Sequence, residues 1–200
     1  MWGAPIVTRP TSCGESAGVA SPHAPLYLGE MELRGTKCTV RTYRPGDERS
    51  LARNGNNRKI WLNLRDRFPQ PFTEAGGASY IAHVLAAPET PSFAIDVGGD
   101  AVGGISLHPG TDIERLSAEI GYWLGEDHWG RGIMTEAIRL VTRHAFTTLD
   151  LVRVFAVPFA HNVGSCRALE NAGYVREGLM RKSAVKDGHV IDQYLYAIVR

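Results

Sequence analysis

The chain has 200 residues, of which 44% are hydrophobic and 22% charged, and its formal net charge is +1. This length and composition suit one globular domain with a sizeable core. The small net charge argues against nucleic acid or an anionic membrane as the main partner, and no apolar run is long enough to span a membrane.

Residues 1–30 are rich in Gly, Pro, Ser, Ala and Thr and show no sustained periodicity. We expect them to form a flexible extension of a domain that covers residues 31–200. A second interpretation is that the extension covers a surface of the domain or bridges to a partner chain.

The first strand is expected at residues 38–43, which alternate and are rich in residues that favour β-structure. A turn follows, and Asp47 is expected to cap a short helix. Further along, Phe68 and Phe72 lie on a loop that two prolines make irregular. These aromatic side chains can line a pocket or pack over the core, and the second outcome is the commoner one.

An amphipathic helix is predicted from Thr73, with Tyr80 on its apolar stripe. Two short apolar runs, residues 93–97 and 101–107, are then separated by a glycine-rich break that predicts a hairpin. Residues 117–124 form a third antiparallel strand.

A glycine-bearing loop joins this strand to a helix whose pattern continues from Thr135. The first amides of a helix have no partner within it and carry partial positive charge. Gly130 and Gly132 let the backbone turn with positive φ and let an anion approach closely, while Arg131 adds a charge. A phosphate or pyrophosphate is the expected ligand, and the alternative is a plain connecting turn. The loop lacks the third glycine of a dinucleotide fingerprint and the Gly-Lys-Ser/Thr ending of a P-loop.

The remaining residues complete the sheet. Residues 151–157 are predicted to form a strand parallel to residues 117–124, because a helix connects the two. Asn162 fits the N-cap of a short helix that Gly173 ends. Two final strands are expected at residues 174–178 and 190–199.

This order of elements resembles the Gcn5-related N-acetyltransferase (GNAT) superfamily. The motifs that carry the resemblance are AEIGYWL at 118–124, WGRGIMTEA at 129–137 and NVGS at 162–165. Within the superfamily, the chain looks most like the branch of ribosomal-protein N-terminal acetyltransferases. The resemblance implies an α+β fold: a single mixed, mostly antiparallel twisted sheet of about seven strands, flanked by helices, with a splayed parallel pair at the cofactor slot.

The resemblance also implies a binding site for acetyl-CoA. The loop amides would hold the diphosphate of the coenzyme, and residues 122–124 match a bulged segment that binds the pantetheine arm and polarises the thioester carbonyl. Asn162 matches an asparagine that contacts the arm, and Arg167 would meet a phosphate. The full set expected to bind the coenzyme is Tyr122, Trp123, Leu124, Trp129, Gly130, Arg131, Gly132, Ile133, Met134, Thr135, Asn162 and Arg167.

Two catalytic residues are expected, Ser165 from the resemblance and Glu119 from strand alternation, which puts it on the same face as Gly121 and Trp123. The alternative role for Glu119 is a solvated or ion-paired strand carboxylate. Ser165 stands where this branch carries a serine that can donate a proton to the leaving thiolate; many relatives use a tyrosine at the position of Leu169 instead. The alternative role for Ser165 is a hydroxyl that bonds the backbone in the first turn of a helix. Glu119 is the first choice of base, and Asp192 is a weaker one. A glutamate that some ribosomal-protein relatives carry near Ala184 is absent. The acceptor-side walls are expected to be Phe68, Phe72 and Tyr80.

The three cysteines are far apart and the seven histidines lack zinc-ligand spacing, so we expect a reduced, cytoplasmic protein without a metal. The leading hypothesis is an N-acetyltransferase that moves acetyl from acetyl-CoA to a primary amine, on a protein N-terminus or a small molecule, by direct attack. The alternatives are a non-catalytic acyl-CoA sensor or partner subunit and a transferase of a larger acyl group such as succinyl. The expected partners are the amine acceptor and a second copy of the chain in a homodimer.

Overall fold

The computed structural model describes residues 31–86 and 90–200. The predicted flexible extension at residues 1–30 lies outside the described residues. Within them, no helix is both long enough and apolar enough to cross a membrane.

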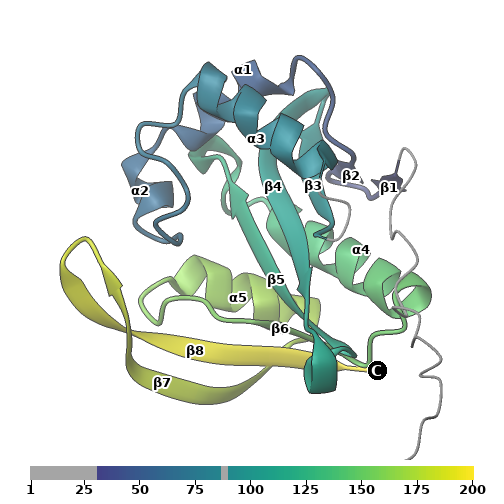
Figure 1. The fold of residues 1–200 in the computed structure, drawn as a ribbon, viewed down its shortest axis with the longest axis vertical. Helices are drawn as coiled ribbons and strands as arrows, with labels where there is room; N and C mark the ends of the chain where they lie inside the picture. The colour runs from purple at the N-terminus through teal and green to yellow at the C-terminus, as the bar shows by residue number, and fades with distance from the viewer. Residues whose placement is uncertain (1–30, 87–89) are drawn as a thin grey trace, which may run out of the picture.

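The described residues form one eight-stranded sheet, with the strand order β1-β2-β3-β4-β5-β6-β8-β7 (Figure 1). Every neighbouring pair is antiparallel except β5 and β6, which are parallel. The strands are β1 Glu32–Arg34, β2 Thr39–Arg41, β3 Ser92–Val97, β4 Asp100–Pro109, β5 Ser117–Leu124, β6 Arg153–Ala156, β7 Val175–Lys186 and β8 His189–Val199. The predicted mixed sheet with its parallel pair is confirmed.

We expected about seven strands, and the described residues form eight. β1, only three residues long, pairs with β2 across the turn at Gly35, and no periodicity marks so short a strand in the sequence. Among the described residues, three helices precede β3, where the sequence predicted two. They are α1 Asp47–Gly55, α2 Arg58–Trp61 and α3 Glu74–Ala86, and the four residues of α2 are too few for a helical pattern to be recognised.

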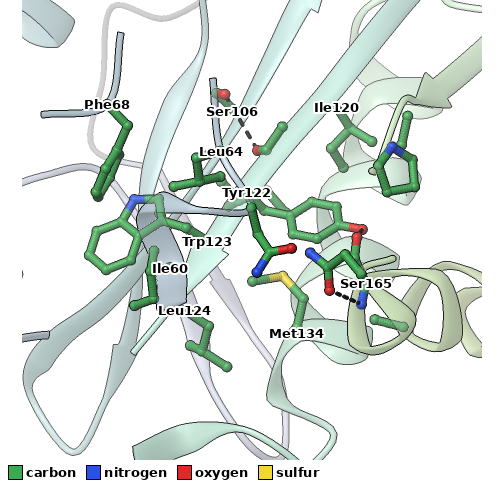
Figure 2. Close-up of a pocket in the computed structure, with 18 of the residues that line it drawn as sticks. Ile60, Leu64, Phe68, Ser106, Ile120, Tyr122, Trp123, Leu124, Met134 and Ser165 are labelled. Carbon is green, nitrogen blue, oxygen red and sulfur yellow. Dashed lines mark hydrogen bonds between the residues drawn. The ribbon is translucent and has the colours of Figure 1, made fainter. Parts of the chain in front are cut away.

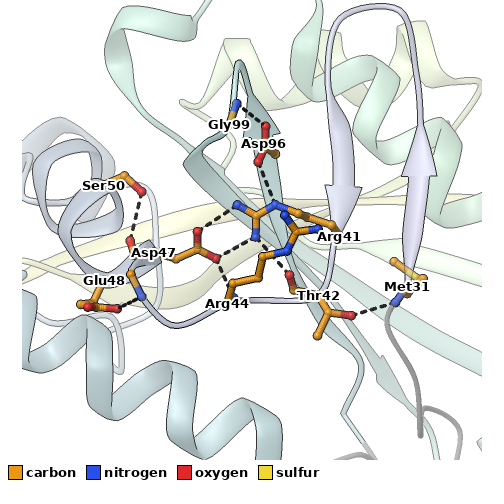
Figure 3. Close-up of polar contacts among 10 residues, drawn as sticks. Met31, Arg41, Thr42, Arg44, Asp47, Glu48, Ser50, Asp96 and Gly99 are labelled. Carbon is orange, nitrogen blue, oxygen red and sulfur yellow. Dashed lines mark hydrogen bonds and ion pairs between the residues drawn. The ribbon is translucent and has the colours of Figure 1, made fainter.

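Asp47 does not cap α1, contrary to the sequence prediction. Gly46 holds the N-cap position without a side-chain hydrogen bond, and Asp47 is the first residue of the helix. The carboxylate of Asp47 instead accepts hydrogen bonds from two nitrogens of Arg41, at 2.8 and 2.9 Å (Figure 3). A guanidinium and a carboxylate form a strong bidentate pair, and this pair is buried, so it takes precedence over the cap.

Hydrophobic side chains fill both faces of the sheet because neighbouring strand residues point to opposite sides. Phe93 and Ile95 pack in the larger core, beneath α4 (Ile133–Thr148) and α5 (Val163–Ala172). Ala94, between them in the sequence, belongs to the smaller cluster beneath α1 and α3. The two clusters fix the helices on either side of β4 and β5, and the candidate site lies where these strands pass between them.

Candidate functional site

A cavity of about 1320 Å³ runs through the middle of the domain. Its walls come from the segment between α2 and α3, from β4 and β5, from the start of α4 and from α5. Figure 2 shows two sides of this cavity: Trp123 of β5 points toward Phe68, and Tyr122 points toward Ser165. The strand β5 therefore separates two compartments that meet along the cavity.

The gap between β5 and β6 opens after three residue pairs. The parallel register joins Ser117, Ala118 and Glu119 to β6 and then ends. On its other side β5 pairs with β4 as far as Leu124, and Gly125 N donates to Val102 O. Backbone groups alternate between the two edges of a strand, so the amides of Tyr122 and Leu124 face the opening.

The bulge expected at residues 122–124 is absent. The register between β4 and β5 runs without a shift from Ala118 to Leu124. The two amides are free because β6 diverges from β5, and not because β5 is distorted. The predicted splayed strand pair is thus confirmed. It opens because β6 diverges, without the bulge in β5 that the resemblance implied.

The loop before α4 has the predicted left-handed turns. Gly130 and Gly132 have φ values of 72° and 76°, and Gly132 is the N-cap of α4. The helix begins at Ile133, two residues before the expected Thr135, and is 16 residues long. Trp129 fastens the loop to the strand, because its indole Nε1 donates to Leu124 O at 2.8 Å.

The remaining loop residues differ in whether they line the cavity. Ile133, Met134 and Thr135 all line the cavity, and Ile133 is also part of the buried core. Arg131 is exposed and does not line the cavity, although the sequence placed it in the coenzyme-binding set. Lys37, which the sequence analysis did not single out, reaches the loop from the β1–β2 turn, and its Nζ donates to Arg131 O at 3.0 Å.

The turn before α5 brings three of the predicted residues to the cavity. Asn162 is the N-cap as expected, and its Oδ1 accepts from Ser165 N at 3.1 Å. Ser165 Oγ lies 2.9 Å from the phenol oxygen of Tyr122, so the hydroxyl has a side-chain partner on β5. Burial raises the pKa of Tyr122, which keeps the phenol protonated. Arg167 also lines the cavity.

The aromatic residues on the opposite side of β5 form a stacked wall. Phe68 and Phe72 have ring centroids 5.1 Å apart, and Phe68 meets Trp123 edge-on at 5.5 Å. Tyr80 of α3 lines the same compartment and contacts Tyr43. All three predicted wall residues reach the cavity, and Phe72 packs in the smaller core as well.

The predicted base Glu119 is ion-paired. Its Oε1 lies 2.5 Å from a guanidinium nitrogen of Arg65, on the loop after α2. His108 of β4 is directly opposite Glu119 in the strand register and lines the same compartment. The weaker candidate Asp192 does not line the cavity, because its carboxylate accepts from Lys182 N within the β7–β8 hairpin.

The tip of the β7–β8 hairpin is attached to the segment that contains α2. Figure 1 shows the hairpin extending beneath this segment. Lys186 Nζ lies 2.7 Å from Asp66 Oδ1 and 3.5 Å from the centroid of the Trp61 ring. Arg58 forms a second bridge, to Asp187 at 2.6 Å. We call these contacts the hairpin clasp, and they hold the segment whose residues Ile60, Asn63 and Leu64 line the aromatic compartment.

No three His, Cys, Asp or Glu side chains of the described ranges gather where they could hold a metal ion. The side chains that line the cavity include hydroxyls, imidazoles, guanidinium groups and the carboxylate of Glu119.

Comparison with known proteins places this site in a family. A model of the acetyltransferase (GNAT) domain matches residues 37–175. The probable N-acetyltransferase YjcK of Bacillus subtilis (strain 168) is 46% identical over 174 residues, which cover 84% of this chain and 96% of that protein. The ribosomal-protein-serine acetyltransferase of Escherichia coli (strain K12) is 31% identical over 107 residues, covering 52% of this chain and 58% of that enzyme.

Among solved structures, Mycobacterium smegmatis RimJ in complex with CoA-disulfide superimposes with a TM-score of 0.75. The two chains are 24% identical, and the match covers 85% of this chain and 86% of the other. This likeness bears on the fold alone. The domain match and the near full-length alignment with the Bacillus relative go further: the chain belongs to the GNAT family of acetyltransferases.

Proposed function

We propose that this acetyltransferase moves the acetyl group of acetyl-CoA to a primary amine, on a protein N-terminus or on a small molecule, by direct attack of the amine on the thioester. The observation that carries the proposal is the divergence of β5 from β6 next to the loop at the start of α4. This arrangement places two groups of amides in one cavity: the unpaired amides of the strand edge and the amides at the N-terminus of the helix. They lie at opposite ends of the slot between β5 and β6.

The acyl donor fits this slot by its chemistry. A diphosphate needs close backbone amides and partial positive charge, which the positive-φ glycines and the start of a 16-residue helix supply. The extended pantetheine arm carries amide groups that can pair with a free strand edge, as a third strand would. On this assignment Tyr122 and Leu124 offer backbone amides to the arm, and Asn162 and Arg167 contribute from α5.

The reaction needs a donor for the departing thiolate and an acceptor for the amine's proton. A thiol has a pKa of about 8.5, so one hydroxyl donor suffices. We assign that role to Ser165, whose Oγ is held by the phenol of Tyr122. The base has to lie on the other face of β5, where Glu119 and His108 are opposite each other.

The aromatic compartment is the proposed site of the acceptor. Phe68, Phe72 and Trp123 form an apolar wall beside the slot, and the hairpin clasp holds the neighbouring α2 segment in place. A protein N-terminus is supported by the 31% identity to an enzyme named for ribosomal-protein serine, but that match covers about half of this chain. A small amine is equally compatible with an enclosed compartment. A cytoplasmic location and a homodimer remain predictions from the sequence.

Titration calorimetry with acetyl-CoA, CoA and succinyl-CoA tests the donor first. We expect micromolar affinity for acetyl-CoA; no binding to any of the three would overturn the proposal. Thiol release is then measured with an amine panel: peptides that begin with Ser or Ala, an N-terminally blocked lysine peptide, spermidine and free amino acids. Faster release with succinyl-CoA than with acetyl-CoA would favour transfer of a larger group, and binding without release for any amine would favour a sensor.

A further inference from the structure

Gly121 leaves a hollow on the acceptor face of β5. Along this strand Glu119, Gly121 and Trp123 point to the same side, and Gly121 is the one without a side chain. A methyl group built there would lie 3.5 Å from Ser106 Oγ and 3.8 Å from His108 Nε2, with no other atom of the surroundings within 4 Å. A small group that enters from the aromatic compartment therefore meets these two polar atoms.

The hollow adjoins the place proposed for the thioester. Tyr122, the next residue, holds Ser165 Oγ from the opposite face of the strand. An amine over Gly121 and a thiolate donor at Ser165 would thus stand on opposite sides of the same short stretch of β5. Attack on a thioester carbon gives a tetrahedral adduct in which the incoming nitrogen and the departing sulfur are separate substituents. The proton acceptor and the proton donor can therefore come from different faces of the strand.

The contacts of His108 indicate which of its nitrogens is free of a proton. A guanidinium nitrogen of Arg67 lies 3.4 Å from His108 Nε2, and a guanidinium can only donate. This contact favours Nε2 as the acceptor, with the ring proton on Nδ1. Ser106 Oγ, 3.0 Å from the same Nε2, fixes the direction of the ring. The lone pair of a neutral imidazole is thus directed toward the hollow.

Both partners of the lone pair are exchangeable. Ser106 Oγ, 3.0 Å from Nε2, can turn its hydroxyl to Gly121 O, 3.4 Å away, and the contact with Arg67 is weak. The 3.4 Å separation between the guanidinium and Nε2 is long for a hydrogen bond, and Arg67 is an exposed side chain. The carboxylate of Glu119 is held differently, by an ion pair of 2.5 Å to Arg65. An incoming amine can displace Arg67 from the imidazole more readily than Arg65 from the carboxylate.

The charged groups around the ring keep it neutral. Partial burial lowers the pKa of His108, and the guanidinium of Arg67 lowers it further, with a smaller contribution from Arg65; the carboxylate of Glu119 acts in the opposite direction. The imidazole is accordingly in its basic form at neutral pH, which a proton acceptor requires.

We propose that His108, and not Glu119, takes the proton from the attacking amine; the inference rests on the proposed function. The amine nitrogen forms a bond to the carbonyl carbon, and one of its N–H protons passes to His108 Nε2. The carbon–sulfur bond then breaks, and the thiolate takes a proton from Ser165 Oγ. The imidazolium returns its proton to solvent, and Ser165 recovers one from solvent. Glu119 acts as a positioning residue that holds Arg65.

The test compares His108→Gln with Glu119→Gln over a range of pH. The probe is acetyl-CoA with the best amine of the panel, and kcat/KM is measured from pH 5 to 9. With kcat/KM referred to the concentration of neutral amine, we expect the wild-type profile to have an acidic limb below the usual histidine pKa of about 6.5. His108→Gln should lose this limb and about 10²-fold in kcat, the usual contribution of a general base. Glu119→Gln should keep the limb.

Two controls separate folding from catalysis. Acetyl-CoA affinity and the thermal midpoint are measured for both variants, and His108→Asn serves as a second substitution if the first does not fold. His189→Gln, an exposed histidine on β8, should match wild type throughout.

The inference is overturned if His108→Gln and His108→Asn keep the acidic limb and the wild-type rate, or if Glu119→Gln alone loses the limb. A wild-type protein that releases no thiol with any amine overturns the proposed function instead, and the assignment of His108 falls with it. Nitrogen-detected NMR of the histidine rings checks the tautomer without turnover: a proton on Nε2 at pH 7 would contradict the assignment.

Discussion

The phenol oxygen of Tyr122 lies 2.9 Å from Ser165 Oγ and so joins the middle of β5 to the first turn of α5. This contact spans the opening left by β6, and it holds the hydroxyl over the slot. It also fixes the direction of the Ser165 hydroxyl, which the position of a serine in the first turn of a helix does not determine by itself.

Ser165→Ala should lower kcat by about 10²-fold, as expected when a general acid is removed. Acetyl-CoA affinity should change little, because Ser165 is not assigned to the diphosphate or the arm. Tyr122→Phe, the matched variant, keeps the hydroxyl but loses its partner, and a smaller loss in kcat is expected. Steady-state kinetics with calorimetry of acetyl-CoA gives both quantities; an unchanged rate in Ser165→Ala would remove this residue from the mechanism.

Gly132→Glu should weaken acetyl-CoA binding by about 10²-fold or more, because a carboxylate would face the phosphate-binding amides. A side chain at this φ of 76° is strained, and its Cβ would lie 2.6 Å from Lys37 Nζ. Gly132→Ala imposes the same strain without the charge and is the control. Calorimetry decides: equal affinities in the two variants would mean that strain, and not repulsion, is measured.

Arg41→Ala should destabilise the domain by about 3–5 kcal/mol, the usual loss when one partner of a buried ion pair is removed. The side chains of Arg41 and Asp47 are only 4% and 8% exposed, and Asp96 bonds the same guanidinium (Figure 3). Arg34→Ala is the control, since its side chain is 80% exposed. Urea unfolding measures both, and a similar loss of stability in the two variants would argue against a special contribution from the buried pair.

Glu136 should make stability depend on acid pH. Although burial acts to raise its pKa, hydrogen bonds from the Lys37, Thr36 and Cys38 amides and the Thr36 hydroxyl hold this pKa down to about 2. A lowered folded-state pKa contributes stability above the unfolded value of about 4.3, which is lost as the pH falls toward the folded one.

Glu136→Gln should therefore cost about 1–3 kcal/mol at pH 7, the range for hydrogen bonds to a charged group. The difference from wild type should shrink between about pH 4.3 and pH 2. Glu74→Gln, whose side chain is 60% exposed, is the matched control. Unfolding curves at pH 7, 4 and 3 check the trend, and a cost independent of pH would contradict it.

Lys186→Met should raise the KM of the acceptor by about 3- to 10-fold, because a loosened hairpin clasp loses a cation–π contact and an ion pair. Acetyl-CoA affinity should stay at the wild-type value. Kinetics with the acceptor varied at saturating acetyl-CoA test this, and Lys182→Met on the same hairpin is the control. A change in donor affinity alone would show that the clasp acts elsewhere.

Local signals were enough to predict much of this structure. The turn at Gly98-Gly99 marked the β3–β4 hairpin, and Asn162 and Gly173 marked the two ends of α5. These residues act through their own backbone conformation or their near neighbours, so the sequence around each one carries the information. The glycines before α4 belong to the same class, and their positive φ values were expected from residue type.

The contacts that could not be predicted from the sequence depend on which strands lie opposite each other in the sheet. His108 faces Glu119 only through the β4–β5 register, and Arg65 reaches that carboxylate from a segment 54 residues away. Lys37 contacts the loop at Arg131 across 94 residues. No spacing rule links such pairs, so their roles appear only once the sheet is assembled.

The hairpin clasp also bears on how the chain reaches its native state. It joins residues 120 and 129 apart in the sequence, and the strand β8 lies inside the sheet, between β6 and β7. Contacts between distant residues form slowly, since the intervening chain has to be ordered first. During synthesis on the ribosome, the segment from Arg58 to Asp66 can therefore form these contacts only after almost the whole domain has emerged. The hairpin clasp is then among the last contacts to form during synthesis.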